Sequence, residues 1–193
     1  MSNGGKIRLV GNVLPRYVYW IVTNEGKKRP IECISFDRES ESFNGSRQDP
    51  MQEIDSSIYS EKPVFAYVCN AIDRSDGQVK LVDLKKTIYN SIIDLAKNPE
   101  YGNPAHPDSG YDVTIKKEKT GPLAQNVKYH VTPGRNSSPL TEEEKAMELF
   151  ELDTIFKTQT YEEQKKWLIE NTSYFTNSVG GDFRPDETAE DLV

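Results

Sequence analysis

Residues 16–30, with the sequence RYVYWIVTNEGKKRP, place aromatic rings and positive charge in one short segment. The rings are Tyr17, Tyr19 and Trp20, and the cations that follow after a short turn are Lys27, Lys28 and Arg29. If the first half is a strand, Tyr17 and Tyr19 share one face and Trp20 lies on the other. Rings stack on bases of any identity and cations neutralise phosphates, so the segment is typical of a surface that binds single-stranded nucleic acid.

Similar side chains recur along the rest of the chain. The candidate cations for phosphate contacts are Arg8, Arg16, Lys27, Lys28, Arg29, Lys80, Lys85, Lys86, Lys116, Lys117, Lys119 and Arg135. The candidate rings for base stacking are Tyr17, Tyr19, Trp20, Tyr67, Tyr89 and Tyr111. Each cation cluster alone also fits a solvated face, and each ring alone also fits a hydrophobic core. Three cation clusters on neighbouring elements favour a groove, but the sequence leaves open which face of the first strand borders it.

Motifs for catalysis and for metal binding are absent from the sequence. It contains no GxxxxGK[ST], no HExxH and no GxSxG, and no GxGxxG follows a strand. His106 lies near Asp108 and Asp112, which admits a metal-dependent nuclease, although acid-rich Pro/Gly loops more often form turns. No CxxC pair occurs, and Cys33 and Cys69 lie in apolar alternating runs. We therefore expect no enzymatic activity, no cofactor and no metal, and two buried free thiols.

Charge is unevenly distributed along the 193 residues, whose formal net charge is -7. Residues 1–139 hold 19 Lys and Arg against 17 Asp and Glu, whereas residues 140–193 hold 5 against 14. An N-terminal part of balanced charge followed by an acidic C-terminal part is typical of a polyanion-binding domain with an acidic tail. The same distribution also fits acidic helices exposed to solvent. No apolar run approaches the roughly 18 residues that cross a bilayer, so we expect a cytoplasmic protein without membrane contact.

Hydrophobic periodicity changes once along the chain. Alternation predicts five strands before the first helix, over 6–10, 17–23, 30–36, 64–72 and 78–84. Leu84, Ile88, Ile92 and Leu95 then have helical spacing, and Pro99 ends the helix. Two more strands are expected over 111–119 and 126–133. A helix before the last hairpin of a small barrel predicts a mainly β protein with an OB-fold, a five-stranded Greek-key barrel, although a split sandwich also fits this order.

The predicted organisation has one core and two appendages. Residues 1–139 form the OB-fold core, in which residues 39–62 lack a sustained period and are expected to be an insertion. Residues 140–175 carry C-terminal helices, the first of which begins with a capping box of Thr141 and Glu144. Residues 176–193 are expected to be a flexible acidic tail.

Three longer segments together resemble a known family. They are GKIRLVGNVLPRYVYWIV, GQVKLVDLKKTIYNSIIDLAKNPEYGNPAHPDSGYDVTIKKEKTG and VKYHVTPGRNSSPLTEEE, and they cover roughly residues 5–150. In the order of their segments and in their residue types they resemble the single-stranded DNA-binding, helix-destabilising proteins of tailed bacteriophages, the family that includes the T-even phage protein. The resemblance implies an OB-fold protein that coats single-stranded DNA during phage replication, recombination and repair in the infected bacterial cell, without base-specific readout.

The resemblance also implies partners, with two departures. The T-even proteins hold a Cys/His zinc cluster in the barrel, but residues 39–62 contain neither residue type, so zinc is not expected. Those proteins also use a basic N-terminal arm for cooperative self-association, and MSNGG offers no such arm, which leaves self-association along DNA open. The resemblance assigns an acidic C-terminus to the recruitment of replication and recombination proteins. The residues here that match this role are Asp186, Glu187, Glu190 and Asp191.

Two other functions fit the same sequence. An acidic protein-interaction module on an OB-like barrel would dock a partner or mimic nucleic acid, and the pI of about 5.0 suits it. Against this alternative, a DNA mimic would spread its acidic residues over the folded domain. An RNA-binding barrel would differ only in its sensitivity to the 2′-hydroxyl, which no residue reveals.

Overall fold

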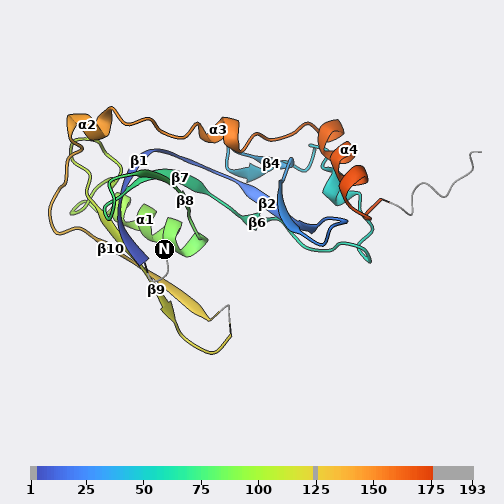
Figure 1. Ribbon diagram of the computed structural model, residues 1–193, viewed down its shortest axis with the longest axis horizontal. Coiled ribbons are helices and arrows are strands. Elements are labelled where there is room, and N and C mark those ends of the chain that lie inside the picture. Colours follow the sequence, from blue (N-terminus) through green and yellow to red (C-terminus); the bar gives the residue numbers. More distant parts are fainter. Residues whose placement is uncertain (1–3, 124–125, 176–193) are drawn as a thin grey trace, which may run out of the picture.

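The computed structural model describes residues 4–123 and 126–175, and this part of the chain is built mainly from β-strands (Figure 1). Its largest sheet has five strands in the order β10-β9-β1-β7-β8, all antiparallel. These strands are β1 (Gly4–Leu14), β7 (Val68–Asp73), β8 (Val79–Asp83), β9 (Val113–Lys119) and β10 (Val127–Pro133). The helix α1 (Lys86–Lys97) follows β8 in the chain and contacts β10.

The strand order is that of an OB-fold barrel opened along one edge. The helix stands between the third and fourth strands of the sheet in chain order, as an OB-fold requires. A closed barrel would need a pair between β8 and β10, and the described strands do not form it. The expectation of a mainly β fold is therefore confirmed, and the strand order is consistent with an OB-like fold, whereas the described strands do not form the expected closed barrel.

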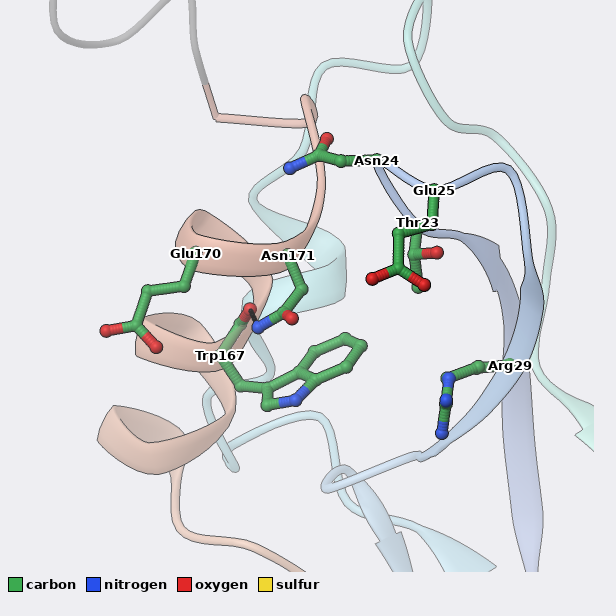
Figure 2. Close-up of a pocket in the computed structure, with 7 residues that line it drawn as sticks. All are labelled: Thr23, Asn24, Glu25, Arg29, Trp167, Glu170 and Asn171. Carbon is green, nitrogen blue, oxygen red and sulfur yellow. Dashed lines mark hydrogen bonds between the residues drawn. The ribbon is translucent and has the colours of Figure 1, made fainter.

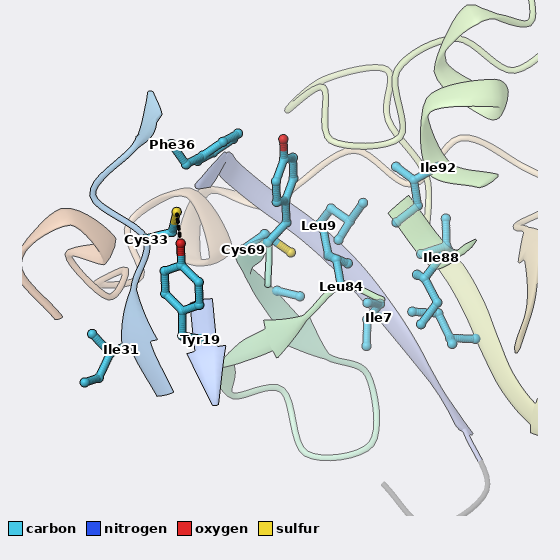
Figure 3. Packing of buried hydrophobic residues seen from close by; sticks show 14 of the residues in the cluster. Ile7, Leu9, Tyr19, Ile31, Cys33, Phe36, Cys69, Leu84, Ile88 and Ile92 are labelled. Carbon is cyan, nitrogen blue, oxygen red and sulfur yellow. Dashed lines mark hydrogen bonds between the residues drawn. The ribbon is translucent and has the colours of Figure 1, made fainter. Parts of the chain in front are cut away.

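One main hydrophobic core joins the inner face of the five-stranded sheet, one face of α1 and the buried side chains of residues 15–67 (Figure 3). Its buried members include Ile7, Leu9, Ala71, Ile88 and Val113. Cys33 and Cys69 are free and buried, as the sequence predicted. Burial raises the pKa of the Cys69 thiol to about 12, because the interior disfavours the charged thiolate.

Residues 15–67 form a second unit, here called the lobe, inserted between β1 and β7. The lobe contains a three-stranded sheet in the order β3-β2-β6 and a separate two-stranded ladder. The elements are β2 (Tyr17–Val22), β3 (Lys28–Glu32), β4 (Phe36–Asp37), β5 (Ser42–Phe43), the short 3-10 helix η1 (Pro50–Gln52) and β6 (Val64–Phe65). The structure thus places the strands expected over 17–23 and 30–36 in the lobe rather than in the barrel.

The strand expected over 64–72 is divided between the two units. Its first part, β6, pairs with β2 in the lobe, and its second part, β7, pairs with β1 in the five-stranded sheet. The break lies at Ala66, whose N–H donates to the carbonyl of Arg16 at 2.9 Å. Pro15 on the opposite strand has no N–H to offer, so the ladder cannot continue regularly through this point. The chain therefore enters and leaves the lobe at one place.

A buried polar cluster explains why residues 39–62, which lack periodicity, are nevertheless folded. Asp49 caps η1, since one carboxylate oxygen accepts from the N–H of Met51 at 3.0 Å. The other oxygen accepts from the N–H of Ser35 at 3.3 Å and from the Tyr19 hydroxyl at 3.4 Å. Figure 3 shows this hydroxyl pointing at Cys33. Local caps thus replace hydrophobic alternation as the ordering force in this segment.

The described C-terminal residues, 140–175, run from the five-stranded sheet to the lobe (Figure 1). They contain α2 (Glu142–Lys145), α3 (Leu152–Ile155) and α4 (Tyr161–Asn171). The capping box of Thr141 and Glu144 is confirmed, and a second one, of Thr160 and Glu163, begins α4. The tail, residues 176–193, lies outside the described residues.

The first half of this C-terminal segment, residues 140–156, is here called the strap. Leu140 of the strap joins Val10 and Ile72 in a second, smaller hydrophobic cluster on the outer face of the sheet. The side-chain amide of Asn70 donates to the carbonyl of Phe150 at 3.0 Å and accepts from its N–H at 3.1 Å. These two hydrogen bonds attach the strap to β7.

Candidate nucleic-acid interface

Burial removes five of the predicted contact residues from the surface. Those that are at most 5% exposed are Arg8, Arg16, Tyr19, Tyr67 and Tyr111. The Arg8 guanidinium donates to the carbonyls of His106 at 2.6 Å, of Ser138 at 3.1 Å and of Pro104. A buried polar group must find its partners inside the protein, and these side chains have done so. We therefore correct their assignment: in this conformation they support the fold, and of the five only Arg16 borders a hollow of the proposed interface, with its guanidinium already paired with Glu32.

Ion pairs occupy the buried Arg16 and two more of the predicted cations, Lys27 and Lys80. Arg16 pairs with Glu32 and lies 3.8 Å from the ring centre of Phe156. Lys27 pairs with Glu25 at 2.7 Å. Lys80 lies 2.7 Å from Asp73, and its hydrogen bond, with those from Ser75, holds the pKa of that carboxyl far below its usual range. To bind a phosphate, each of these cations would have to give up its carboxylate partner. Paired cations therefore contribute less to phosphate binding than unpaired cations do.

The other predicted cations are exposed, with no carboxylate within 4.0 Å in the described part of the chain. They are Lys28, Arg29, Lys85, Lys86, Lys116, Lys117, Lys119 and Arg135. Lys28, Arg29 and Lys85 lie on the lobe and at the start of α1, whereas the three β9 lysines lie on the β9-β10 hairpin. Unpaired surface cations repel one another at no gain to the fold, which makes them the better candidates for phosphate contacts.

The register of the lobe sheet settles which ring of the opening segment reaches solvent. Tyr19 and Ile21 point into the core, so Trp20 and Val22 point outwards, with exposures of 45% and 44%. Tyr17, on the inner face, packs in a ring cluster, 5.9 Å from Phe65 and 6.4 Å from Tyr67 between ring centres. Tyr89 of α1 belongs to the same cluster, 4.9 Å from Tyr67. Trp20, rather than the tyrosine pair, is thus the exposed ring of β2.

Trp20 borders a groove of about 380 Å³ between the lobe and the five-stranded sheet, here called the Trp20 groove. Pro30 stands opposite Trp20 in the β2-β3 ladder. Val64 of β6 and Leu81 of β8 add exposed apolar surface, with exposures of 44% and 36%. The remaining lining residues are Arg16, Val18, Phe65, Ala66, Val68, Asp83, Leu84, Lys85 and Phe156. Flat apolar side chains edged by an unpaired lysine can stack a base and hold its phosphate.

Two further hollows continue the Trp20 groove across the lobe. The middle one, of about 340 Å³, shares Arg16, Pro30 and Phe156 with the Trp20 groove. The last one, of about 330 Å³, shares Arg29 and Trp167 with the middle one (Figure 2). The three hollows are here called the track. Both tryptophans of the chain lie on it, although they are separated by most of the sequence.

Sequence reasoning missed three residues of the track. Phe156, Lys157 and Trp167 line it, and the sequence had placed them only on acidic C-terminal helices. Phe156 and Trp167 lie in a segment that the sequence predicts to carry helices, but they were not among the candidates for base stacking. Nothing in the sequence indicates that the C-terminal segment crosses to the lobe, because that depends on tertiary contacts.

The β9-β10 hairpin carries a second cationic surface. Lys117 stands opposite Tyr129 in the ladder, and Lys116 stands opposite His130. His130 lies 2.8 Å from Glu118, which neutralises part of this surface. The lysines of this hairpin line none of the three hollows of the track.

Fold and site together define a class, namely mainly β proteins, consistent with an OB-like fold, that carry an apolar, tryptophan-bearing groove edged by an unpaired lysine. Comparison with known proteins adds a relative. No family model matches the chain. The chain is 35% identical, over 125 residues and 60% of its length, to the probable ssDNA-binding protein of Escherichia phage T5. The match spans 46% of that relative, so the chain corresponds to about half of its length.

The described residues contain neither a membrane-spanning helix nor a cluster of metal-ligand side chains. No helix in residues 4–123 and 126–175 is long and apolar enough to cross a membrane. Within the same ranges, no group of three or more His, Cys, Asp or Glu side chains is placed to hold a metal ion.

Proposed function

We propose that this protein binds single-stranded DNA without base-specific readout, and that the Trp20 groove is its main contact surface. The observation that carries the proposal is the exposed Trp20, set among Val64 and Leu81 and next to the unpaired Lys85. The similarity to a probable ssDNA-binding protein of a phage supports the choice of ligand.

The position of the groove on the fold also supports the proposal. OB-folds bind oligonucleotides on the face of their second and third strands, flanked by the loop after the first strand and the loop after the fourth. Here those strands are β7 and β8, the lobe replaces the first loop, and the β9-β10 hairpin carries the other. A single strand of DNA bound in the groove would thus have the lysines of the β9-β10 hairpin on one side and the lobe on the other.

Binding of this kind needs no chemistry on the nucleic acid. Cations release the counterions that surround the phosphates, and Trp20 offers a π-face to a base of any identity. Because the groove captures only unpaired bases, binding shifts hairpins and duplex ends towards the open form by mass action. We therefore propose a non-enzymatic protein that coats single strands during phage DNA replication, recombination and repair.

Partner proteins belong to the same proposal. The acidic residues Asp186, Glu187, Glu190 and Asp191 would recruit replication and recombination proteins; they lie outside the described residues. Deleting residues 176–193 should abolish capture of such partners while leaving affinity for DNA intact or raised.

The decisive experiment is fluorescence anisotropy of a labelled oligo-dT at two salt concentrations, with duplex DNA and oligo-rU as competitors. The expected result is an affinity that duplex does not compete, with log K falling against log salt by about 0.7 for each phosphate neutralised. Equal competition by oligo-rU would show that the ligand is any single-stranded nucleic acid. No binding at low salt, even without residues 176–193, would overturn the proposal in favour of a protein-interaction module.

A further inference from the structure

The hollow at the far end of the track lies between the β2-β3 turn and α4 (Figure 2). It measures about 330 Å³, which is within the range of pockets that hold small organic ligands. One wall is the indole of Trp167 and the facing wall carries Arg29, with Thr23 and Asn24 above them. In Figure 2 the indole points from α4 into the space between the two walls.

Both walls are held in place by hydrogen bonds and packing. The N–H of Asn24 donates to the carbonyl of Asn171 at 2.8 Å, which ties the turn to the end of α4. The Asn171 side chain donates to the carbonyl of Trp167 at 2.9 Å. Leu168, the next residue of α4, is fully buried in the core. The indole is therefore presented at a fixed place rather than on a free helix.

Among the charged residues that line this hollow, Arg29 is the cation and Glu25 and Glu170 are the acids. Its two acidic residues have partners, since Glu25 lies 2.7 Å from Lys27 and Glu170 lies 3.9 Å from Lys166. Arg29 has no carboxylate within 4.0 Å among the described residues. The indole of Trp167 can stack on a flat, apolar ring, and the guanidinium of Arg29 on the facing wall can pair with a negative charge attached to that ring. A nucleotide has this chemistry.

The hollow is continuous with the Trp20 groove. Arg29 and Trp167 also line the middle hollow, which Phe156 and Lys157 of the C-terminal segment border. Phe156 in turn borders the Trp20 groove. A single strand lying on Trp20 could therefore continue past Phe156 to Trp167 without leaving an apolar, cation-edged surface.

We propose that α4 completes the binding site, and that Trp167 and Arg29 hold a second base and its phosphate at the far end of the track. The inference rests on the proposed function, because it concerns the same strand of DNA. It goes further because it gives the lobe and α4 one shared ligand. It also predicts that oligonucleotides long enough to reach from Trp20 to Trp167 bind more tightly than shorter ones.

The chain has two tryptophans, which allows each end of the track to be observed separately. Trp167→Phe leaves Trp20 as the only tryptophan, and Trp20→Phe leaves Trp167. Each variant is titrated with oligo-dT of increasing length, and binding is followed by anisotropy and by tryptophan emission in the same cuvette. Short oligonucleotides should quench Trp20 alone, and longer ones should quench both tryptophans.

Arg29→Ala gives a second test at an exposed position that the fold does not need. It should weaken the binding of long oligo-dT about tenfold and leave short oligo-dT unaffected, since the cation that holds one phosphate is lost and the base on Trp167 is held less well. Arg47→Ala is the matched control, because Arg47 is an exposed arginine that pairs with Asp37 away from the track.

The outcomes separate the inference from the proposed function. If long oligo-dT binds and quenches Trp20 but never Trp167, the DNA-binding function stands and the second subsite is wrong. Equal losses from Arg29→Ala and Arg47→Ala would also overturn the second subsite. If neither tryptophan responds and anisotropy shows no binding, the proposed function itself fails.

Discussion

At the scale of single residues, Trp20 illustrates how a ring can be costly to the free protein and useful to the complex. Its exposure of 45% leaves apolar surface in water that a folded protein would normally cover. The neighbouring rings, Tyr17 and Tyr19, point the other way and are needed for packing. Removing Trp20 should therefore affect binding far more than stability.

Trp20→Ala should reduce affinity for oligo-dT by roughly tenfold to a hundredfold, because base stacking contributes about 1–3 kcal/mol for each base. The matched control is Tyr101→Ala, at an aromatic residue that is 42% exposed and lies away from the track. Anisotropy titrations measure both affinities, and urea unfolding should show less than about 1 kcal/mol change for either variant. Equal losses of affinity would contradict a specific role for Trp20.

Lys85 and Lys80 are both lysines near the groove, but only Lys80 has carboxylate partners. Lys85→Ala should lower the slope of log K against log salt by about 0.7, the value for one phosphate contact on a single strand. Lys80→Ala should change the slope much less. Lys85 makes no side-chain capping hydrogen bond to α1, so its replacement leaves the helix start intact. A slope unchanged in Lys85→Ala would remove this residue from the interface.

Arg8 was predicted to bind phosphate, and its burial turns it into a test of the fold. Arg8→Lys should destabilise the protein by about 3 kcal/mol, because one ammonium cannot serve three carbonyls from a planar fork. Urea unfolding measures the change, with Arg47→Lys as an exposed control. A loss below about 1 kcal/mol would mean that the guanidinium contacts are dispensable.

At the scale of elements, α4 is held to the lobe by one fully buried apolar side chain and by several polar contacts. Leu168 is fully buried, Gln164 donates to the carbonyl of Glu32 at 2.8 Å, and Lys165 pairs with Glu53 at 2.8 Å. A helix of three turns with a polar outer surface has little stability on its own, so these contacts decide whether it docks. Docking of α4 should therefore be separable from folding of the five-stranded sheet.

Leu168→Ala should cost about 3 kcal/mol locally, through lost burial and the cavity that remains. Hydrogen exchange should speed up in α4 and leave β1 and β7 unchanged. The matched control is Ile169→Ala, because Ile169 is 50% exposed on the same helix. Exchange that accelerates everywhere would show that α4 and the sheet unfold together.

The elements were more predictable than their partners. Alternation located the strands of the two hairpins 17–36 and 111–133, and Thr141 with Glu144 located a helix start. Periodicity gives the faces of a strand but not the strand that pairs with it, so the lobe could not be separated from the barrel. The same limit hid the division of 64–72 between two sheets.

The candidate site was less predictable than the fold. Residue type alone cannot show that Arg8 is buried, since its partners Pro104, His106 and Ser138 are distant in the sequence. It also cannot show that Lys80 is paired with Asp73 and Asp76, because that depends on the conformation of the β7-β8 turn. It also cannot bring Trp167 next to Arg29. Clusters of cations and rings predicted a binding surface on the β2-β3 hairpin, and the structure shows which of these side chains are exposed.

At the scale of the whole molecule, the proposed track spans both units, so a bound strand should stabilise them together. Oligo-dT at 100 times its Kd should raise the free energy of unfolding by about 2.7 kcal/mol. Hydrogen exchange should slow in β8 and in α4 of the same sample. Protection confined to the β9-β10 hairpin would instead make the lysines of that hairpin the main contact surface.

The strap and α4 follow the five-stranded sheet in the chain, yet α4 supplies a wall of the last hollow. During translation, β1, the lobe and the rest of the sheet leave the ribosome before Trp167 does. A nascent chain can therefore present Trp20 before the far end of the track exists. Full affinity for a long single strand would then arise only late in synthesis, which delays capture of DNA by unfinished chains.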